Sequence, residues 1–245
     1  MKFFNNLREL VIKDCKFQKI RKFFQNLRSK QLVKVEIENL ICDKDDVEFL
    51  NDLLNSFNDV NVQFSQNQYR KEYDAQNLFQ SCHNHLSTLT ISYIKLKLDS
   101  EIKDDPKIPV FSCNKSLKYL NLSGCFIEPK GHQVVIMYAM TCPNLKIVSM
   151  KNCNITSINI KLIIKEMANY SFLKCLIDYR ENKIKSPFIL PSTNIFENCT
   201  LLLWENPITY QDKFDFEQNP YHIYLPEEGD DLYYDEMIYG KKELY

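Results

Sequence analysis

Glycine is scarce in this sequence. The 245 residues contain only four glycines, Gly124, Gly131, Gly229 and Gly240, and these form no cluster. A loop that cradles a phosphate needs clustered glycines, because only glycine lets the backbone approach the ligand so closely. The composition therefore argues against a nucleotide-binding enzyme fold.

Long apolar runs are also missing. No stretch approaches the roughly 18 consecutive apolar residues of a membrane-spanning helix. The first residues do not resemble a secretory signal, because Asn5, Arg8 and Glu9 interrupt the apolar positions. A mitochondrial presequence stays open as an alternative, since the segment 16–30 is basic and amphipathic, although Glu9 and Asp14 argue against it.

The nine cysteines are an odd number, which could indicate disulfides in an exported protein. Most of them recur at equivalent positions of the pattern described next, where a small buried residue is expected. Reduced thiols in an intracellular protein are the better interpretation. We expect a cytoplasmic location, with an organelle, the mitochondrion or the cilium, as the alternative.

Two stretches share one spacing, SLKYLNLSGCFI at 116–127 and NLKIVSMKNCNI at 144–155. Each has an apolar residue at a first position and again three, five and ten residues later, with Cys eight residues after the first. This spacing predicts one short buried strand followed by a corner, and it is typical of a leucine-rich repeat. The chain resembles the cysteine-containing subclass of that family, found in ribonuclease inhibitor, Ran GTPase-activating protein and F-box substrate adapters.

The spacing recurs along the chain and predicts about eight repeats. Their first positions are residues 7, 32, 59, 86, 117, 145, 174 and 198. The intervals fit the family's period of about 20 to 29 residues, apart from one longer repeat. The third repeat is the weakest, with polar Asp59 at its first position and Val62 and Phe64 as its strand residues. The register of repeats three, seven and eight stays open.

The resemblance implies an α/β fold, a right-handed horseshoe-shaped solenoid with a parallel sheet on its concave side and helices or irregular segments on its convex side. Apolar residues at helical spacing predict helices within 20–27, 47–57, 134–138 and 160–167. Two proline-containing connections, 95–111 and 185–196, are predicted to be irregular. We divide the chain into a solenoid, 1–210, and a C-terminal arm or cap, 211–245.

Residues that alternate with the buried strand positions point to the concave face. Its C-terminal third is predicted to be a partner-binding surface formed by Tyr119, Ile147, Leu176, Arg180, Leu202 and Trp204. Aromatic and guanidinium groups are frequent in protein-binding hot spots, because they contribute much contact area with little loss of entropy. The alternative is that the chain's own tail covers this surface.

That tail changes in composition near residue 211. Segment 211–245 has ten acidic and three basic residues, a net charge of minus 7, together with eight Phe or Tyr residues. Acidic segments are often disordered, but so many aromatic residues usually become buried. We expect an irregular arm docked on the solenoid or on a partner, with plain disorder as the alternative.

The other predicted partner-binding residues are Phe3 and Phe4. A repeat array normally begins with a polar cap, and these two residues before Leu7 cannot provide one. We expect a partner or a second copy to cover this end. The alternative is that they fold back against Phe23 and Phe24.

The sequence contains no recognisable catalytic constellation. Cys82, His83 and His85 are close enough in sequence to suggest a metal site, but Cys82 also occupies the position of a repeating structural thiol, which we favour. A basic segment, 16–30, could contact phosphates, yet the concave face lacks the interleaved basic and aromatic residues of nucleic-acid binders.

Together these patterns predict a noncatalytic protein–protein interaction module, a scaffold or accessory subunit of a larger intracellular assembly. The expected partners are other protein subunits, with no small-molecule substrate, cofactor, metal, membrane span or specific nucleic-acid target. The alternative is a regulatory adapter of the GTPase-activating or ubiquitin-ligase substrate-recognition type.

Overall fold

The structure is a computed structural model of the whole chain. It describes residues 7–16, 22–24, 32–41, 47–65, 72–82, 84–98, 111–167, 174–185, 199–208 and 222–224, and every structural statement below concerns these residues.

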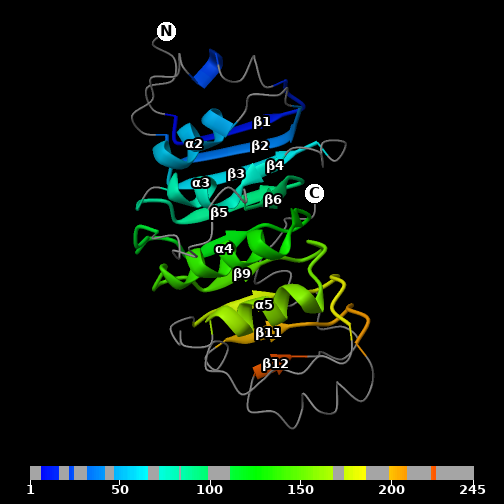
Figure 1. The fold of residues 1–245 in the computed structure, drawn as a ribbon. Coiled ribbons are helices and arrows are strands. Elements are labelled where there is room, and N and C mark those ends of the chain that lie inside the picture. Colours follow the sequence, from blue (N-terminus) through cyan, green and yellow to red (C-terminus); the bar gives the residue numbers. More distant parts are fainter. Residues whose placement is uncertain are drawn as a thin grey trace.

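A nine-stranded, entirely parallel sheet runs through the molecule (Figure 1). Its strands are β1 (Glu9–Lys13), β2 (Lys34–Leu40), β3 (Asp59–Phe64), β5 (Thr88–Ser92), β7 (Tyr119–Asn121), β9 (Ile147–Ser149), β10 (Leu176–Asp178), β11 (Thr200–Leu202) and β12 (His222–Tyr224). The order in the sheet is the order in the chain. Each parallel neighbour is reached by a crossover connection, so the connections stack beside the sheet. The predicted α/β class with a parallel sheet is confirmed.

Helices and a second, smaller sheet lie in these connections. The helices are α2 (Val47–Ser56), α3 (Ala75–Gln80), α4 (Pro129–Met140) and α5 (Ser157–Met167), and they stack along one face of the main sheet (Figure 1). The smaller sheet is parallel and consists of β4 (Glu72–Asp74), β6 (Lys95–Lys97) and β8 (Phe126–Ile127). None of the helices in the described ranges is both long and apolar enough to cross a membrane.

The helices predicted around 47–57, 134–138 and 160–167 are confirmed as α2, α4 and α5. The helix predicted within 20–27 is described only at 22–24, which is helical. Sequence spacing missed α3, which begins where the Asp74 carboxylate accepts a hydrogen bond from the Asn77 N–H at 2.7 Å. The expectation of an irregular segment from residue 95 was wrong at its start, because Lys95–Lys97 pairs with β4 and β8.

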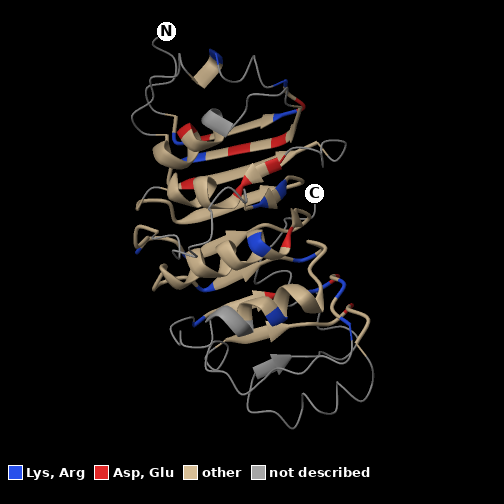
Figure 2. Ribbon diagram, in the orientation of Figure 1, with Lys and Arg blue, Asp and Glu red and all other residues tan. Residues whose placement is uncertain are grey.

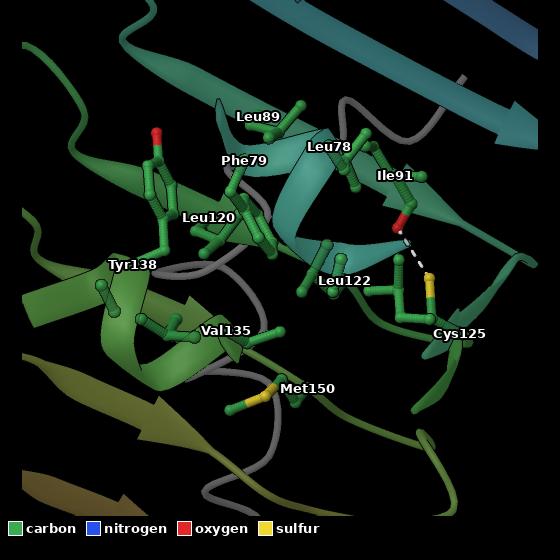
Figure 3. Packing of buried hydrophobic residues seen from close by; sticks show 14 of the residues in the cluster. Leu78, Phe79, Leu89, Ile91, Leu120, Leu122, Cys125, Val135, Tyr138 and Met150 are labelled. Carbon is green, nitrogen blue, oxygen red and sulfur yellow. Dashed lines mark hydrogen bonds between the residues drawn. The ribbon is translucent and has the colours of Figure 1, made fainter. Parts of the chain in front are cut away.

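The core lies between the main sheet and the helices (Figure 3). Strand residues such as Leu120 and Leu122 face Phe79 of α3 and Val135 and Tyr138 of α4, and all five are buried. The rings of Phe79 and Tyr138 are stacked with centroids 4.6 Å apart, which joins consecutive helices. Burying one such side chain contributes about 1.5–3 kcal/mol, so the folding energy is spread along the stack.

The third repeat has a different register from the one predicted. Val60 and Val62 pair with Val35 and Ile37 of β2, so they are its buried strand residues, in place of Val62 and Phe64. Its first position is therefore Phe57, which packs against the core. A shift of two residues keeps every side chain on its predicted face, because strand side chains alternate with period two.

A left-handed corner follows nearly every strand of the main sheet. Seven residues after the first position, φ is positive in seven of the eight units, at Asp14, Asn39, Tyr93, Gly124, Asn152, Glu181 and Glu205. Only one of these residues is glycine. At Gly124 an added Cβ would lie 3.0 Å from the Tyr93 ring, the equivalent residue of the preceding unit. Stacking of corners thus explains why this one corner excludes a side chain.

One residue later, a side chain that is buried in three units and half-buried in the last, at Asn206, ties each corner of the C-terminal half to the preceding unit. It donates a hydrogen bond to the backbone carbonyl that lies five residues after that unit's first position. The four bonds are Cys125 Sγ to Ile91 O (3.3 Å), Cys153 Sγ to Leu122 O (3.0 Å), Asn182 Nδ2 to Met150 O (2.8 Å) and Asn206 Nδ2 to Tyr179 O (2.8 Å). We call these four side chains the corner ladder.

Asparagine does more in the corner ladder than cysteine. Asn182 is 5% exposed, and its Oδ1 accepts hydrogen bonds from the N–H groups of Cys153 and Ile155, both at 2.9 Å. Its Nδ2 also donates to the carbonyls of Tyr179 and Arg180. The side chain thereby supplies partners for backbone groups that turn away from the sheet at the corner.

We expect Asn182→Ala to lower the free energy of unfolding by roughly 3 kcal/mol or more, because it removes the partners of two buried N–H groups and of several carbonyls. Chemical denaturation of the purified chain measures this. Asn152→Gly is the matched control, since Asn152 has positive φ and glycine adopts that conformation at no steric cost. Equal losses in the two variants would contradict the role of the corner ladder.

Candidate functional site

The face of the main sheet opposite the helices is polar over its N-terminal strands. Charged residues lie at the two ends of β1, on either side of exposed Val11, and alternate along β2 (Figure 2). Lys13 is paired to Glu38 at 2.9 Å and Lys34 to Glu9 at 3.6 Å. Exposed pairs of this kind contribute little to stability. We call this surface of the sheet the helix-free face.

Neutral polar residues follow on the next strands of the helix-free face. Asn61, Thr90 and Asn121 are each half-buried and lie on β3, β5 and β7. Their strands are joined in register, so these residues form a row across the sheet. The row offers amide and hydroxyl groups to a contacting molecule, without a strong charge of either sign.

Three residues of the predicted partner-binding surface lie side by side. Tyr119 is the register partner of Ile147, and Ile147 is the register partner of Leu176. Tyr119 and Leu176 are half-buried, whereas Ile147 is only 6% exposed. The aromatic and aliphatic groups are therefore brought together, as the sequence predicted, but the central one is covered.

The other three residues are close together near β10 and β11. The Arg180 guanidinium lies over the Trp204 ring, 4.7 Å from its centroid. Arg180 and Leu202 are both 0% exposed, and Trp204 is half-buried. Ile147, Arg180 and Leu202 are thus buried within the chain, and partner contact at the six residues stays a prediction. Tyr119, Leu176 and Trp204 are the predicted residues that retain accessible surface.

Phe3 and Phe4 lie outside the described residues. The aromatic pair against which they could fold back is described: Phe23 and Phe24 contact each other edge to face at 5.6 Å, and Phe24 lies 6.0 Å from Phe57. This places Phe24 against α2 and the third unit. The predicted cover of the N-terminal end by a partner stays a prediction.

Sequence reasoning missed the burial of a carboxylate toward the C-terminal end of the helix-free face, that of Asp178 on β10. Asp178 Oδ1 accepts from Arg180 Nε at 2.9 Å, and Asp178 Oδ2 accepts from Arg180 Nη2 at 2.9 Å. Ser149 Oγ also donates to Asp178 Oδ2 at 3.1 Å, and Ser149 Oγ lies 2.8 Å from Ser123 Oγ. Both charged residues are fully buried. The network links three units and positions Arg180 over Trp204.

A sequence signal for this pair exists. Asp178 and Arg180 are two residues apart along a strand and its extension, so their side chains project to the same face. An acid and a base in that arrangement can form the bidentate pair seen here. The two side chains were assigned to one face by the repeat, but the burial that makes the pair important comes from tertiary packing.

Two of the buried titratable groups, His132 and Tyr179, contact each other in the core. His132 on α4 is 0% exposed, and burial lowers its pKa to about 3, so the ring is neutral at physiological pH. Its Nε2 lies 2.8 Å from the Tyr179 hydroxyl, whose pKa burial raises. A neutral imidazole beside a protonated phenol is a structural contact between α4 and the strand region of a later unit.

Cys82 lies in the core, as expected of a structural thiol. It is 6% exposed, its Sγ donates to the Leu78 carbonyl at 3.7 Å, and burial raises its pKa to about 12. His83, the proposed neighbouring ligand, lies outside the described residues. In the described part of the chain, no three His, Cys, Asp or Glu side chains come close enough to hold a metal ion.

Comparison of the sequence with family models and with curated proteins gave no match. The resemblance to leucine-rich repeats therefore stays a prediction from the repeating residues.

We expect Asp178→Ala to lower the free energy of unfolding by about 3–5 kcal/mol, because it leaves the Arg180 guanidinium buried without its counter-ion. The double variant Asp178→Leu/Arg180→Met is the control, since two apolar residues replace the pair and should recover most of the loss. Denaturation followed by the fluorescence of Trp204, the only tryptophan of the chain, measures both. A loss below about 1 kcal/mol in the single variant would show that the pair is solvated.

A second expectation concerns pH. The unfolded chain binds a proton at His132 below the usual pKa of about 6.5, whereas the folded chain does not bind it until about pH 3. Folding stability is therefore lost as the pH falls below 6.5. Between pH 7 and pH 5 we expect the free energy of unfolding of His132→Gln to fall by about 2 kcal/mol less than that of the wild type, measured by urea denaturation at the two pH values. An equal fall in the two proteins would contradict a neutral buried imidazole.

Proposed function

We propose that this chain is a leucine-rich-repeat-type solenoid and that it works as a noncatalytic protein–protein interaction module, a scaffold or accessory subunit of a larger intracellular assembly. The repeated geometry supports the first part. Strands in chain order, left-handed corners at equivalent residues and the corner ladder recur with the period of the sequence repeat.

The helix-free face is the proposed contact surface, and its shape and chemistry carry the proposal. On this face the strands β1, β2, β3, β5 and β7 leave every second residue exposed or half-buried, while helices cover the opposite face. On β9, β10 and β11 the alternate residues are largely buried. Its accessible residues are polar and neutral in the middle, with half-buried Tyr119, Leu176 and Trp204 toward the C-terminal end. Such a mixture of polar groups around aromatic residues is typical of protein interfaces.

The chemistry of the buried residues supports a noncatalytic role. The titratable groups discussed above are a neutral histidine, the protonated thiol of Cys82 and the buried Asp178–Arg180 ion pair, none of which is arranged as an acid–base pair. The eight cysteines in the described ranges are all free, which supports a reducing, intracellular location. The alternative of a regulatory adapter would be favoured by stimulation of a candidate GTPase by the purified chain.

We expect Tyr119→Ala to weaken partner binding about 30-fold or more, because half-buried tyrosines at the centre of an interface contribute roughly 2 kcal/mol. Ile158→Ser is the matched control, since Ile158 is the most exposed large apolar side chain described and belongs to α5, among the helices. Each tagged variant is expressed in the native source, and mass spectrometry quantifies the proteins recovered with it. A partner lost with both variants, or with Ile158→Ser alone, would place the interface elsewhere.

A further inference from the structure

Two thiols lie side by side where strands β10 and β11 begin. Leu176 and Thr200 are register partners in adjacent parallel strands, so Cys175 and Cys199, one residue before each, are also opposite each other. The Thr200 N–H donates to the Cys175 carbonyl at 3.1 Å, which fixes the backbones together at this point. The pair therefore lies where the two backbones are hydrogen-bonded to each other.

Burial is unusual at this position, the one directly after the first position of a unit. In earlier units the equivalent residues Val33, Lys118 and Lys146 are exposed. Cys175 and Cys199 are instead 7% and 1% exposed and belong to the core cluster. The repeat does not require a thiol at this position, since other units use lysine or valine.

The spacing of the two backbones suits a covalent bond. Adjacent strands are about 4.8 Å apart, within the roughly 4.4–6.8 Å between Cα atoms that a disulfide can bridge. The two thiols also influence each other: interaction with the Cys175 thiol lowers the pKa of Cys199, and interaction with the Cys199 thiol raises the pKa of Cys175. Cys199 is therefore the more readily deprotonated of the two.

We propose that Cys175 and Cys199 form a redox-active dithiol that closes to an intramolecular disulfide when the protein meets a peroxide. The Cys199 thiolate attacks the peroxide, an S–O bond forms, the O–O bond breaks, and the leaving oxygen takes up a proton and departs as water. The Cys175 thiol then attacks the sulfenic sulfur, the S–S bond forms and a second water leaves. Two thiols lose two electrons in total, and one hydrogen peroxide is reduced to two waters.

The same chain contains a matched comparison. Cys125 and Cys153 are also buried cysteines at equivalent positions of adjacent units, but each donates to a carbonyl of the preceding unit as part of the corner ladder. Burial raises the pKa of both, to about 12 for Cys125. Their sulfurs are protonated and engaged with backbone, so they should resist the same oxidant.

The test treats the folded full-length chain with hydrogen peroxide, blocks the remaining thiols by alkylation and maps tryptic peptides by mass spectrometry without reduction. Trypsin places Cys175 in peptide 175–180, Cys199 in 186–213, Cys125 in 119–130 and Cys153 in 152–161. We expect the 175–180 and 186–213 peptides to be recovered linked in most molecules, and the 119–130 and 152–161 peptides to be recovered alkylated.

A second readout is thermal. Because the new bond closes the segment 175–199, oxidation should raise the Tm by roughly 5 to 10 °C, and reduction should reverse the rise. Cys175→Ser should abolish the rise, whereas Cys113→Ser, which alters an exposed thiol, should preserve it. If Cys175→Ser does not fold, the peptide map of the wild type still decides.

Four results would overturn the proposal. Three of them are oxidation of Cys199 without a linked peptide, linkage of Cys125 to Cys153 in equal yield, and linkage of Cys175 to Cys199 only after unfolding in urea. A link from Cys175 to Cys142, whose thiol also influences the pKa of Cys175, would likewise overturn it. None of these outcomes depends on the proposed binding function.

Discussion

The corner ladder is the interaction on which the stacking depends. Seven of the eight units leave the sheet through a left-handed residue, and the turn removes several backbone groups from strand pairing. In the four C-terminal units of these, one side chain each, Cys in two units and Asn in the next two, supplies a missing partner by reaching the preceding unit. Because these four bonds cross between units, none of the four units can form its corner alone.

The choice between cysteine and asparagine sets how strongly a corner is held. A thiol donates one weak bond, whereas Asn182 accepts two backbone N–H groups and donates to three carbonyls. The asparagine corners adjoin the buried Asp178–Arg180 pair, where two charges have been removed from water. The additional hydrogen bonds of the asparagine corners offset part of the desolvation cost of the ion pair next to them. They also confine the charged network to one arrangement.

The fold could be predicted from the sequence to the extent that residues repeat. The spacing of Leu117, Leu120 and Leu122 predicts a strand, and the same spacing recurs from Leu145, which leaves few other interpretations. The register predicted for the third unit was wrong. Its first position is Phe57 and not Asp59, which becomes evident only when β3 is paired with β2. The short helix α3 and the strand β6 were missed because neither is long enough to display a period.

The sequence predicted on which face of the sheet the site residues lie, but not how accessible they are to solvent, and the reason is physical. Alternation along a strand determines which side a residue faces, so Tyr119, Ile147 and Leu176 were placed together correctly. The solvent exposure of a residue depends on which other parts of the chain pack over that side, and a local sequence pattern does not predict this packing. A fully buried ion pair beside a half-buried Trp204 indicates that this end of the helix-free face is organised before any partner arrives. A partner that binds there would lose little entropy in ordering the surface, so its affinity would depend on the few accessible groups at the margin of the pair.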